Sequence, residues 1–161
     1  MNWQEICDNP VFRDLPFKLE TNQWGKIEMS PATNEHGIYQ VALIEWLIEL
    51  SKEGRPISEC SVQTEKGVKV ADVAWGSYEF FERNKRRNPY PESPEIMIEI
   101  LSASNSRKEM QGKRKLYFTA GAKEVWLCGE DGGMTFFSPE GELAGSGIVE
   151  GFPGKIEIDF A

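Results

Sequence analysis

Two acidic residues stand inside segments of the sequence that are otherwise apolar. Asp72 lies in Val-Lys-Val-Ala-Asp-Val-Ala-Trp (68–75), and Glu99 lies in Glu-Ile-Met-Ile-Glu-Ile-Leu (95–101). Both segments are short, rich in Val and Ile, and bounded by turn-forming or Pro-containing stretches, which predicts two β-strands. A carboxylate in a sheet core is costly unless it is paired, hydrogen-bonded or metal-bound, and two on neighbouring strands repel unless a cation lies between them. This pair is the best indication of function in the sequence.

A lysine on the next predicted helix could complete a site with these acids. Ser106-x-x-Glu109 is typical of a capping box and predicts a helix from 106 to 120. On a helical wheel, one arc holds Met110, Leu116, Tyr117 and Ala120. Lys113 lies at the centre of this arc and Glu109 lies within it. The amine of Lys113 therefore either extends to the edge of the core or approaches Asp72 and Glu99.

Two carboxylates and a lysine suit metal-assisted phosphoryl chemistry. Hard oxygen ligands from Asp and Glu favour Mg²⁺, which bridges to phosphate oxygens and lowers the pKa of an attacking water. The lysine can orient that water or neutralise charge that develops on the phosphorus group. The residues alone do not distinguish a nuclease from a fold that keeps a salt-bridged polar core.

Composition narrows the class of protein. A chain of 161 residues fits one domain, and no apolar run is long enough to span a bilayer. Three scattered cysteines, Cys7, Cys60 and Cys128, suit reduced thiols in a cytoplasmic protein better than a disulfide framework. With His36 as the only histidine, no zinc-type cluster is present in the sequence.

The charge distribution is uneven. A net charge of −8 argues against a protein that coats nucleic acid, since phosphate binding depends on Lys and Arg. However, residues 105–123 carry six basic side chains and one acid, and a second basic cluster occupies 83–87. This pattern is compatible with one basic face on an acidic body, or simply with solvated helix faces.

The order of predicted elements indicates a mixed β-sheet flanked by helices. A hairpin at 17–30 precedes a helix from Thr33 to about Lys52. Further strands are expected at 57–65, 68–75, 95–101, 123–128, 134–137 and 155–160, with a short helix at 77–85 and a longer one at 106–120. The predicted fold class is therefore α/β (α+β), as a single domain over residues 1–161.

Several sequence blocks, in a fixed order, resemble a known family. They are Ile27-Glu-Met-Ser-Pro31 with His36-Gly37, Lys69-Val-Ala-Asp-Val-Ala-Trp75, Pro94-Glu-Ile-Met-Ile-Glu-Ile-Leu-Ser-Ala-Ser-Asn105, Lys113-x-x-x-Tyr117, and Ala120-Gly-Ala-Lys-Glu-Val-Trp-Leu127. Together they resemble the Uma2 family (DUF820), bacterial proteins with a restriction-endonuclease-like PD-(D/E)xK fold. The resemblance covers about residues 17–128.

The resemblance implies a metal-dependent endonuclease. By position, Asp72 and Glu99 match the two acidic motif residues, and Lys113 matches a lysine on the following helix. Glu28 matches an acidic position that related nucleases use as an extra metal ligand. The implied metal is Mg²⁺ or Mn²⁺, held by these three acids, and the implied partner is nucleic acid, with DNA as the expected substrate and a homodimer as a further possibility.

The chain departs from the wider nuclease pattern at two positions. Ala71 stands where a proline usually precedes the Asp, although proline has no chemical role there. Leu101 replaces the lysine of the E-x-K pattern, and the resemblance implies that this lysine has moved to the helix, as Lys113.

Several alternatives stay open from sequence. His36 is either a general base or a packed, hydrogen-bonded residue on the apolar face of the 33–52 helix. Glu109 is either a helix cap or a further ligand. The chain as a whole is either an active nuclease, a catalytically inactive descendant that binds nucleic acid or protein, or a structural subunit of a homodimer.

Overall fold

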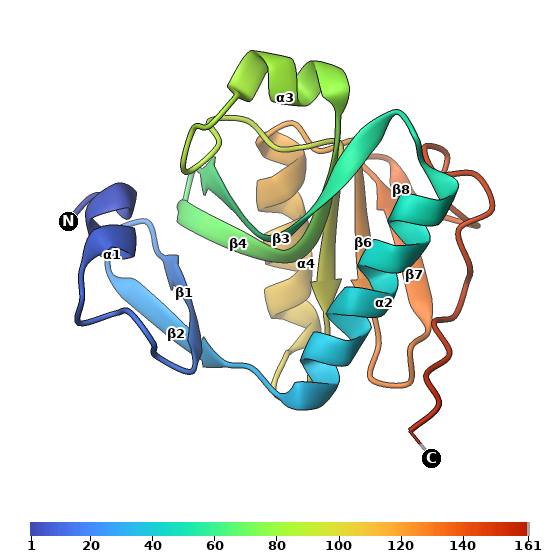
Figure 1. The fold of residues 1–161 in the computed structure, drawn as a ribbon, viewed down its shortest axis with the longest axis horizontal. Coiled ribbons are helices and arrows are strands. Elements are labelled where there is room, and N and C mark those ends of the chain that lie inside the picture. The colour runs from blue at the N-terminus through green and yellow to red at the C-terminus, as the bar shows by residue number, and fades with distance from the viewer. Residues whose placement is uncertain (161) are drawn as a thin grey trace.

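A six-stranded mixed sheet forms the centre of the molecule (Figure 1). The computed structural model describes residues 1–160. In spatial order the strands are β3 (Gly54–Thr64), β4 (Gly67–Ser77), β5 (Ile96–Ile100), β6 (Glu124–Cys128), β7 (Met134–Ser138) and β8 (Gly141–Leu143). Neighbouring strands are antiparallel except β5 and β6, which are parallel and are joined by a helical crossover, as parallel neighbours require.

Two long helices cover opposite faces of this sheet (Figure 1). On one face, α2 (Asn34–Leu50) packs Leu43 and Leu47 into a cluster that includes Ile98. On the other, α4 (Arg107–Thr119) packs Tyr117 into a cluster that includes Met97. Successive strand residues point to opposite faces, so β5, which is buried along its whole length, supplies apolar side chains to both cores. Among residues 1–160, no helix is long and apolar enough to cross a bilayer.

A separate two-stranded ribbon lies beside β4 (Figure 1). It consists of β1 (Phe17–Thr21) and β2 (Ile27–Pro31), paired antiparallel. Side chains of β1 accept hydrogen bonds from the backbone of β4: Thr21 Oγ1 accepts from Val68 at 2.8 Å, and Glu20 Oε1 accepts from Val70 at 2.8 Å. Because β5 pairs with β4 only along Val73–Trp75, this part of β4 needs other acceptors for its N–H groups.

Most predicted elements are confirmed, with small shifts at their ends. The two hairpins, the three predicted helices and the strands through 134–138 occur in the expected order, and short α3 (Tyr78–Asn84) follows β4. The capping box predicted at Ser106 and Glu109 is also confirmed. A first helix, α1 (Trp3–Asp8), was not predicted, although Asn2 and Glu5 form a capping box that begins it.

The strand predicted at 155–160 is wrong. The strand that pairs with β7 is β8, and the 155–160 segment forms only an isolated bridge between Lys155 and Gly133. Its alternating apolar pattern reflects packing rather than a strand ladder, since Ile156 is 1% exposed and joins the core that α2 covers.

The turn between β3 and β4 fixes how closely the ribbon approaches the sheet. Gly67 has φ +88°, and a Cβ there would lie 2.5 Å from the carbonyl oxygens of Thr21 and Asn22. Gly25, in the ribbon's own turn, has φ +72°, but nothing lies within 4 Å of a Cβ built there. Both glycines therefore have a positive φ, but only at Gly67 would an added side chain clash with the backbone of the ribbon.

We expect Gly67→Ala to destabilise the protein more than Gly25→Ala. A left-handed φ costs a non-glycine residue about 1–2 kcal/mol, and forced overpacking adds about 1–3 kcal/mol at Gly67 alone. Urea unfolding of both variants measures the difference. If both variants lost the same unfolding free energy, the close approach of the ribbon to the β3–β4 turn would be contradicted.

Candidate functional site

The site lies where β4 and β5 separate. Their pairing ends at Val73 opposite Ile98, so the next residues on the two strands are Asp72 and Glu99. Both carboxylates are buried, with 2% and 4% of the residue exposed. Beyond the last pair, Ile100 donates its backbone N–H to Asp72 Oδ2 at 2.7 Å, so a side chain rather than a strand accepts this bond. Two acids thus face one another at a fork in the sheet.

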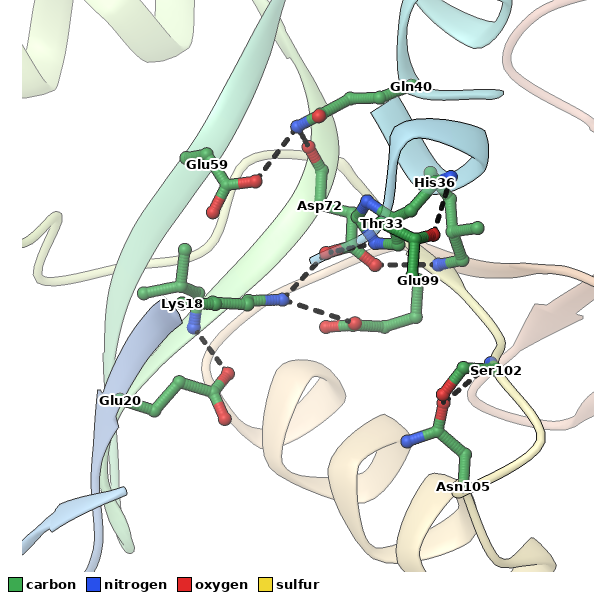
Figure 2. A network of polar contacts seen from close by, with 12 residues as sticks. Lys18, Glu20, Thr33, His36, Gln40, Glu59, Asp72, Glu99, Ser102 and Asn105 are labelled. Atoms are coloured by element: carbon green, nitrogen blue, oxygen red, sulfur yellow. Dashed lines mark hydrogen bonds and ion pairs between the residues drawn. The ribbon is translucent and has the colours of Figure 1, made fainter. Parts of the chain in front are cut away.

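Lys18, from β1 of the ribbon, joins the two acids (Figure 2). Its Nζ lies 2.8 Å from Asp72 Oδ1 and 3.5 Å from Glu99 Oε2. Only 14% of its side chain is exposed. The cation that the sequence required between the carboxylates is therefore present as an ammonium group.

Lys113 approaches Glu99 from the opposite side. As the helical wheel predicted, it points inward from α4, and its Nζ lies 2.9 Å from Glu99 Oε1 and 2.8 Å from Glu20 Oε1. Tyr117, one helical turn further on, donates its hydroxyl to Glu99 Oε1 at 2.5 Å. The helix thus fixes one oxygen of Glu99 and leaves the other, Oε2, facing Lys18.

The charges of these groups are strongly coupled. Burial lowers the pKa of Lys18, but the charges of Glu99 and Asp72 more than reverse this, so the pKa lies above its usual value. Burial opposes ionisation of Asp72, yet the hydrogen bond from His36 and the charge of Lys18 hold its pKa well below the usual range. Burial raises the pKa of Glu99 despite the charges of Lys113 and Lys18. The cost of burying its negative charge is therefore offset less completely than that of Asp72. Tyr117, with its pKa raised well above normal by burial, stays a hydrogen-bond donor.

The N-terminal end of α2 also contacts Asp72, at the same carboxylate oxygen as Lys18 (Figure 2). His36 Nε2 lies 3.2 Å from Asp72 Oδ1, and 20% of the His36 side chain is exposed. Gln40, one turn later, donates to the Asp72 carbonyl at 2.6 Å and to Glu59 Oε1 at 2.9 Å. The hydrogen bond to Asp72 raises the pKa of His36, with burial opposing it. His36 is therefore a partner of Asp72 rather than a residue of the apolar core.

Comparison with known proteins identifies the family. The sequence model of the Uma2 family, described as "Putative restriction endonuclease", matches residues 11–151. This chain belongs to the Uma2 family. A solved structure, of a "putative nuclease belonging to DUF820" from Anabaena variabilis ATCC 29413, is similar with a TM-score of 0.69 and 17% identity, over 87% of this chain and 80% of that one. A comparison with curated proteins finds no match.

Membership of Uma2 supports a nuclease-like function, and the solved structure shows the same fold. The fold class predicted from sequence is thereby confirmed. A nuclease-like family suggests a nucleic acid substrate.

Two acids that the sequence analysis offered for the Uma2 site lie away from its centre. Glu28, on β2, has a side chain that is 51% exposed and contacts Lys69 Nζ at 3.5 Å. Glu109 is exposed at the start of α4, where its carboxylate accepts from the Ser106 backbone at 3.4 Å as a helix cap. Among residues 1–160, no group of three or more His, Cys, Asp or Glu side chains is arranged as a metal cluster.

The ribbon contributes two residues that the sequence analysis did not assign to the site, Lys18 and Glu20. They alternate along β1 and so share one of its faces, and Glu20 is the direct cross-strand neighbour of Glu28. The alternation in Phe17-Lys-Leu-Glu-Thr21 was a usable signal for a shared face. The sequence does not show which strand of the ribbon lies against β4, because that depends on tertiary packing.

The raised pKa of His36 leads to a direct prediction for the metal-free protein. As the only histidine, His36 gives a single set of imidazole NMR signals, and they should titrate above pH 6.5. A raised pKa means that the Asp72 contact stabilises the fold fully below pH 6.5, and that this contribution is lost as pH rises through the native pKa.

The matched variant is His36→Gln, which keeps a polar side chain but cannot titrate. Its deficit in unfolding free energy relative to the parent protein should be larger in mild acid than in alkali. Titration of native His36 at or below pH 6.5 would contradict the assigned contact.

Proposed function

We propose that this chain is a metal-dependent endonuclease that hydrolyses phosphodiester bonds in nucleic acid, with DNA as the expected substrate. The observation that carries the proposal is the convergence of Asp72, Glu99 and Lys113 at the fork between β4 and β5. Membership of Uma2 supports the same reaction class. Lys113 lies on α4, whereas the E-x-K pattern places its lysine two residues after the Glu. This position is compatible with migration of the E-x-K lysine to the helix.

The donor set fits a divalent cation. Asp72 Oδ1 and Glu99 Oε2 already share one positive charge, the ammonium of Lys18, and carboxylate oxygens are the ligands that Mg²⁺ and Mn²⁺ prefer. These two residues would hold the ion. When bound, it would supply Lewis-acid activation of water and of the phosphate.

The chain's own residues hold the reacting groups in place. The Ile100 backbone and His36 orient Asp72, while Tyr117 and Lys113 orient Glu99. Because Lys113 projects from the middle of a helix, its ammonium is well placed to orient an incoming water or to neutralise charge on the phosphate. In this arrangement His36 is a positioning residue.

A non-catalytic binding module is the second candidate. It is favoured by the pairing of each acid at the fork with a lysine of the same chain, and by the absence of a lysine two residues after Glu99. A salt-bridged site of this kind could persist in a protein that binds nucleic acid or another protein without cleaving it. The expectation of a homodimer stays a prediction.

We expect purified protein to cleave at least one member of a panel of single- and double-stranded DNA and RNA when Mg²⁺ or Mn²⁺ is present. Asp72→Asn and Glu99→Gln should abolish cleavage, and Lys113→Met should slow it by about 10²–10³-fold, as removal of one charge-stabilising group does elsewhere. Glu150→Gln, on an exposed acid far along the chain, is the control.

Two outcomes would redirect the proposal. Cleavage that survives in Asp72→Asn would exclude the proposed mechanism. No cleavage of any substrate, together with retained gel-shift binding, would favour the binding module.

Glu28→Gln tests separately whether that acid is a metal ligand, and its contact with Lys69 leads us to expect near-normal activity.

A further inference from the structure

Lys18 occupies the position that the two acids offer to a cation. Asp72 Oδ2 is engaged by the Ile100 N–H, and Glu99 Oε1 is engaged by Lys113 and Tyr117. The remaining oxygens, Asp72 Oδ1 and Glu99 Oε2, both face Lys18 Nζ, and Asp72 Oδ1 also lies 3.2 Å from His36 Nε2 (Figure 2). A metal ion that bridged the two acids through these oxygens would compete directly with this ammonium.

The charge balance favours exchange with a divalent ion. Three carboxylates, those of Glu20, Asp72 and Glu99, share two lysine ammonium groups, so one negative charge is left over. Replacing the single charge of Lys18 by a double charge would balance the site.

Lys18 is also the member of the network with the most freedom to leave. Lys113 projects from the middle of α4, whereas Lys18 lies near the start of β1, next to Phe17, which is 42% exposed. The ribbon is outside the six-stranded sheet and is held to β4 through side chains of Glu20 and Thr21. A lysine side chain on a flexible four-carbon stem can swing toward solvent without disturbing the sheet.

We infer that Lys18 is a built-in counter-ion, which holds Asp72 and Glu99 in place in the metal-free protein and competes with the divalent metal for the same two oxygens. This inference rests on the proposed metal-dependent function and adds that Lys18 lowers the affinity of the site for the metal. Metal binding requires the Lys18 ion pairs to break, so the site binds metal more weakly than its two acids alone would. Loading of the site also frees the ammonium of Lys18.

Metal affinity tests this competition without any cleavage assay. Calorimetric titration with Mn²⁺ should show Lys18→Met binding at least about tenfold more tightly than the parent protein, because a charge-assisted contact no longer has to break. Lys26→Met, on an exposed lysine in the turn of the same ribbon, is the matched control and should bind like the parent.

The outcomes separate this inference from the proposed function. If the parent protein binds Mn²⁺ and Lys18→Met binds no more tightly, the competition is excluded and the metal site stands. If neither protein binds Mn²⁺, or if binding is unchanged in Asp72→Asn, the proposed metal site is excluded and the competition with it.

A measurement on the parent protein avoids dependence on the folding of Lys18→Met. Amine acetylation followed by mass spectrometry should find Lys18 much slower to react than Lys26 in the metal-free protein, because its ammonium is buried and ion-paired. With saturating Mn²⁺, acetylation of Lys18 should become severalfold faster while that of Lys26 stays constant. Lys18 that remains equally protected when Mn²⁺ is bound would overturn the inference.

Discussion

Two buried carboxylates face each other where β4 and β5 part, and the balance of their charge governs the surrounding structure. Removing one partner from a buried ion pair typically costs about 3–5 kcal/mol, so every neighbouring element must supply positive charge or a donor. The fork itself creates donors, since Ile100 and Val70 have no strand partner across the gap between β4 and β5 and donate instead to Asp72 and Glu20. The end of the β4–β5 pairing thus positions the acids and also supplies backbone N–H groups that donate hydrogen bonds to Asp72 and Glu20.

The two lysines come from elements of different rigidity. α4 is capped, packed on the sheet and carries Lys113 and Tyr117 on one face, so it fixes the inner oxygen of Glu99. The ribbon carries Lys18 and lies outside the sheet, where an isolated pair of strands is only marginally stable on its own. In the proposed mechanism, Lys113 is the fixed cation that assists catalysis, and Lys18 is the exchangeable cation that holds the acids before the metal binds.

Sequence reasoning succeeded where local chemistry decides the structure. Asp72 and Glu99 stood out because carboxylates are out of place in apolar strands, and Lys113 because helical periodicity turns it toward the core. It did not find Lys18 and Glu20, whose place depends on which strand of a ribbon docks on β4. It also took the alternation around Ile156 for a strand, although burial without a partner strand gives the same pattern.

The most direct test of the proposed metal site and its competition with Lys18 is a crystal structure with Mn²⁺, measured by anomalous scattering at the manganese edge. We predict one strong peak bonded to Asp72 Oδ1 and Glu99 Oε2, with Lys18 Nζ displaced from both oxygens and Lys113 still on Glu99. A fully loaded crystal with no peak between these acids, or with Lys18 unmoved beside them, would contradict it.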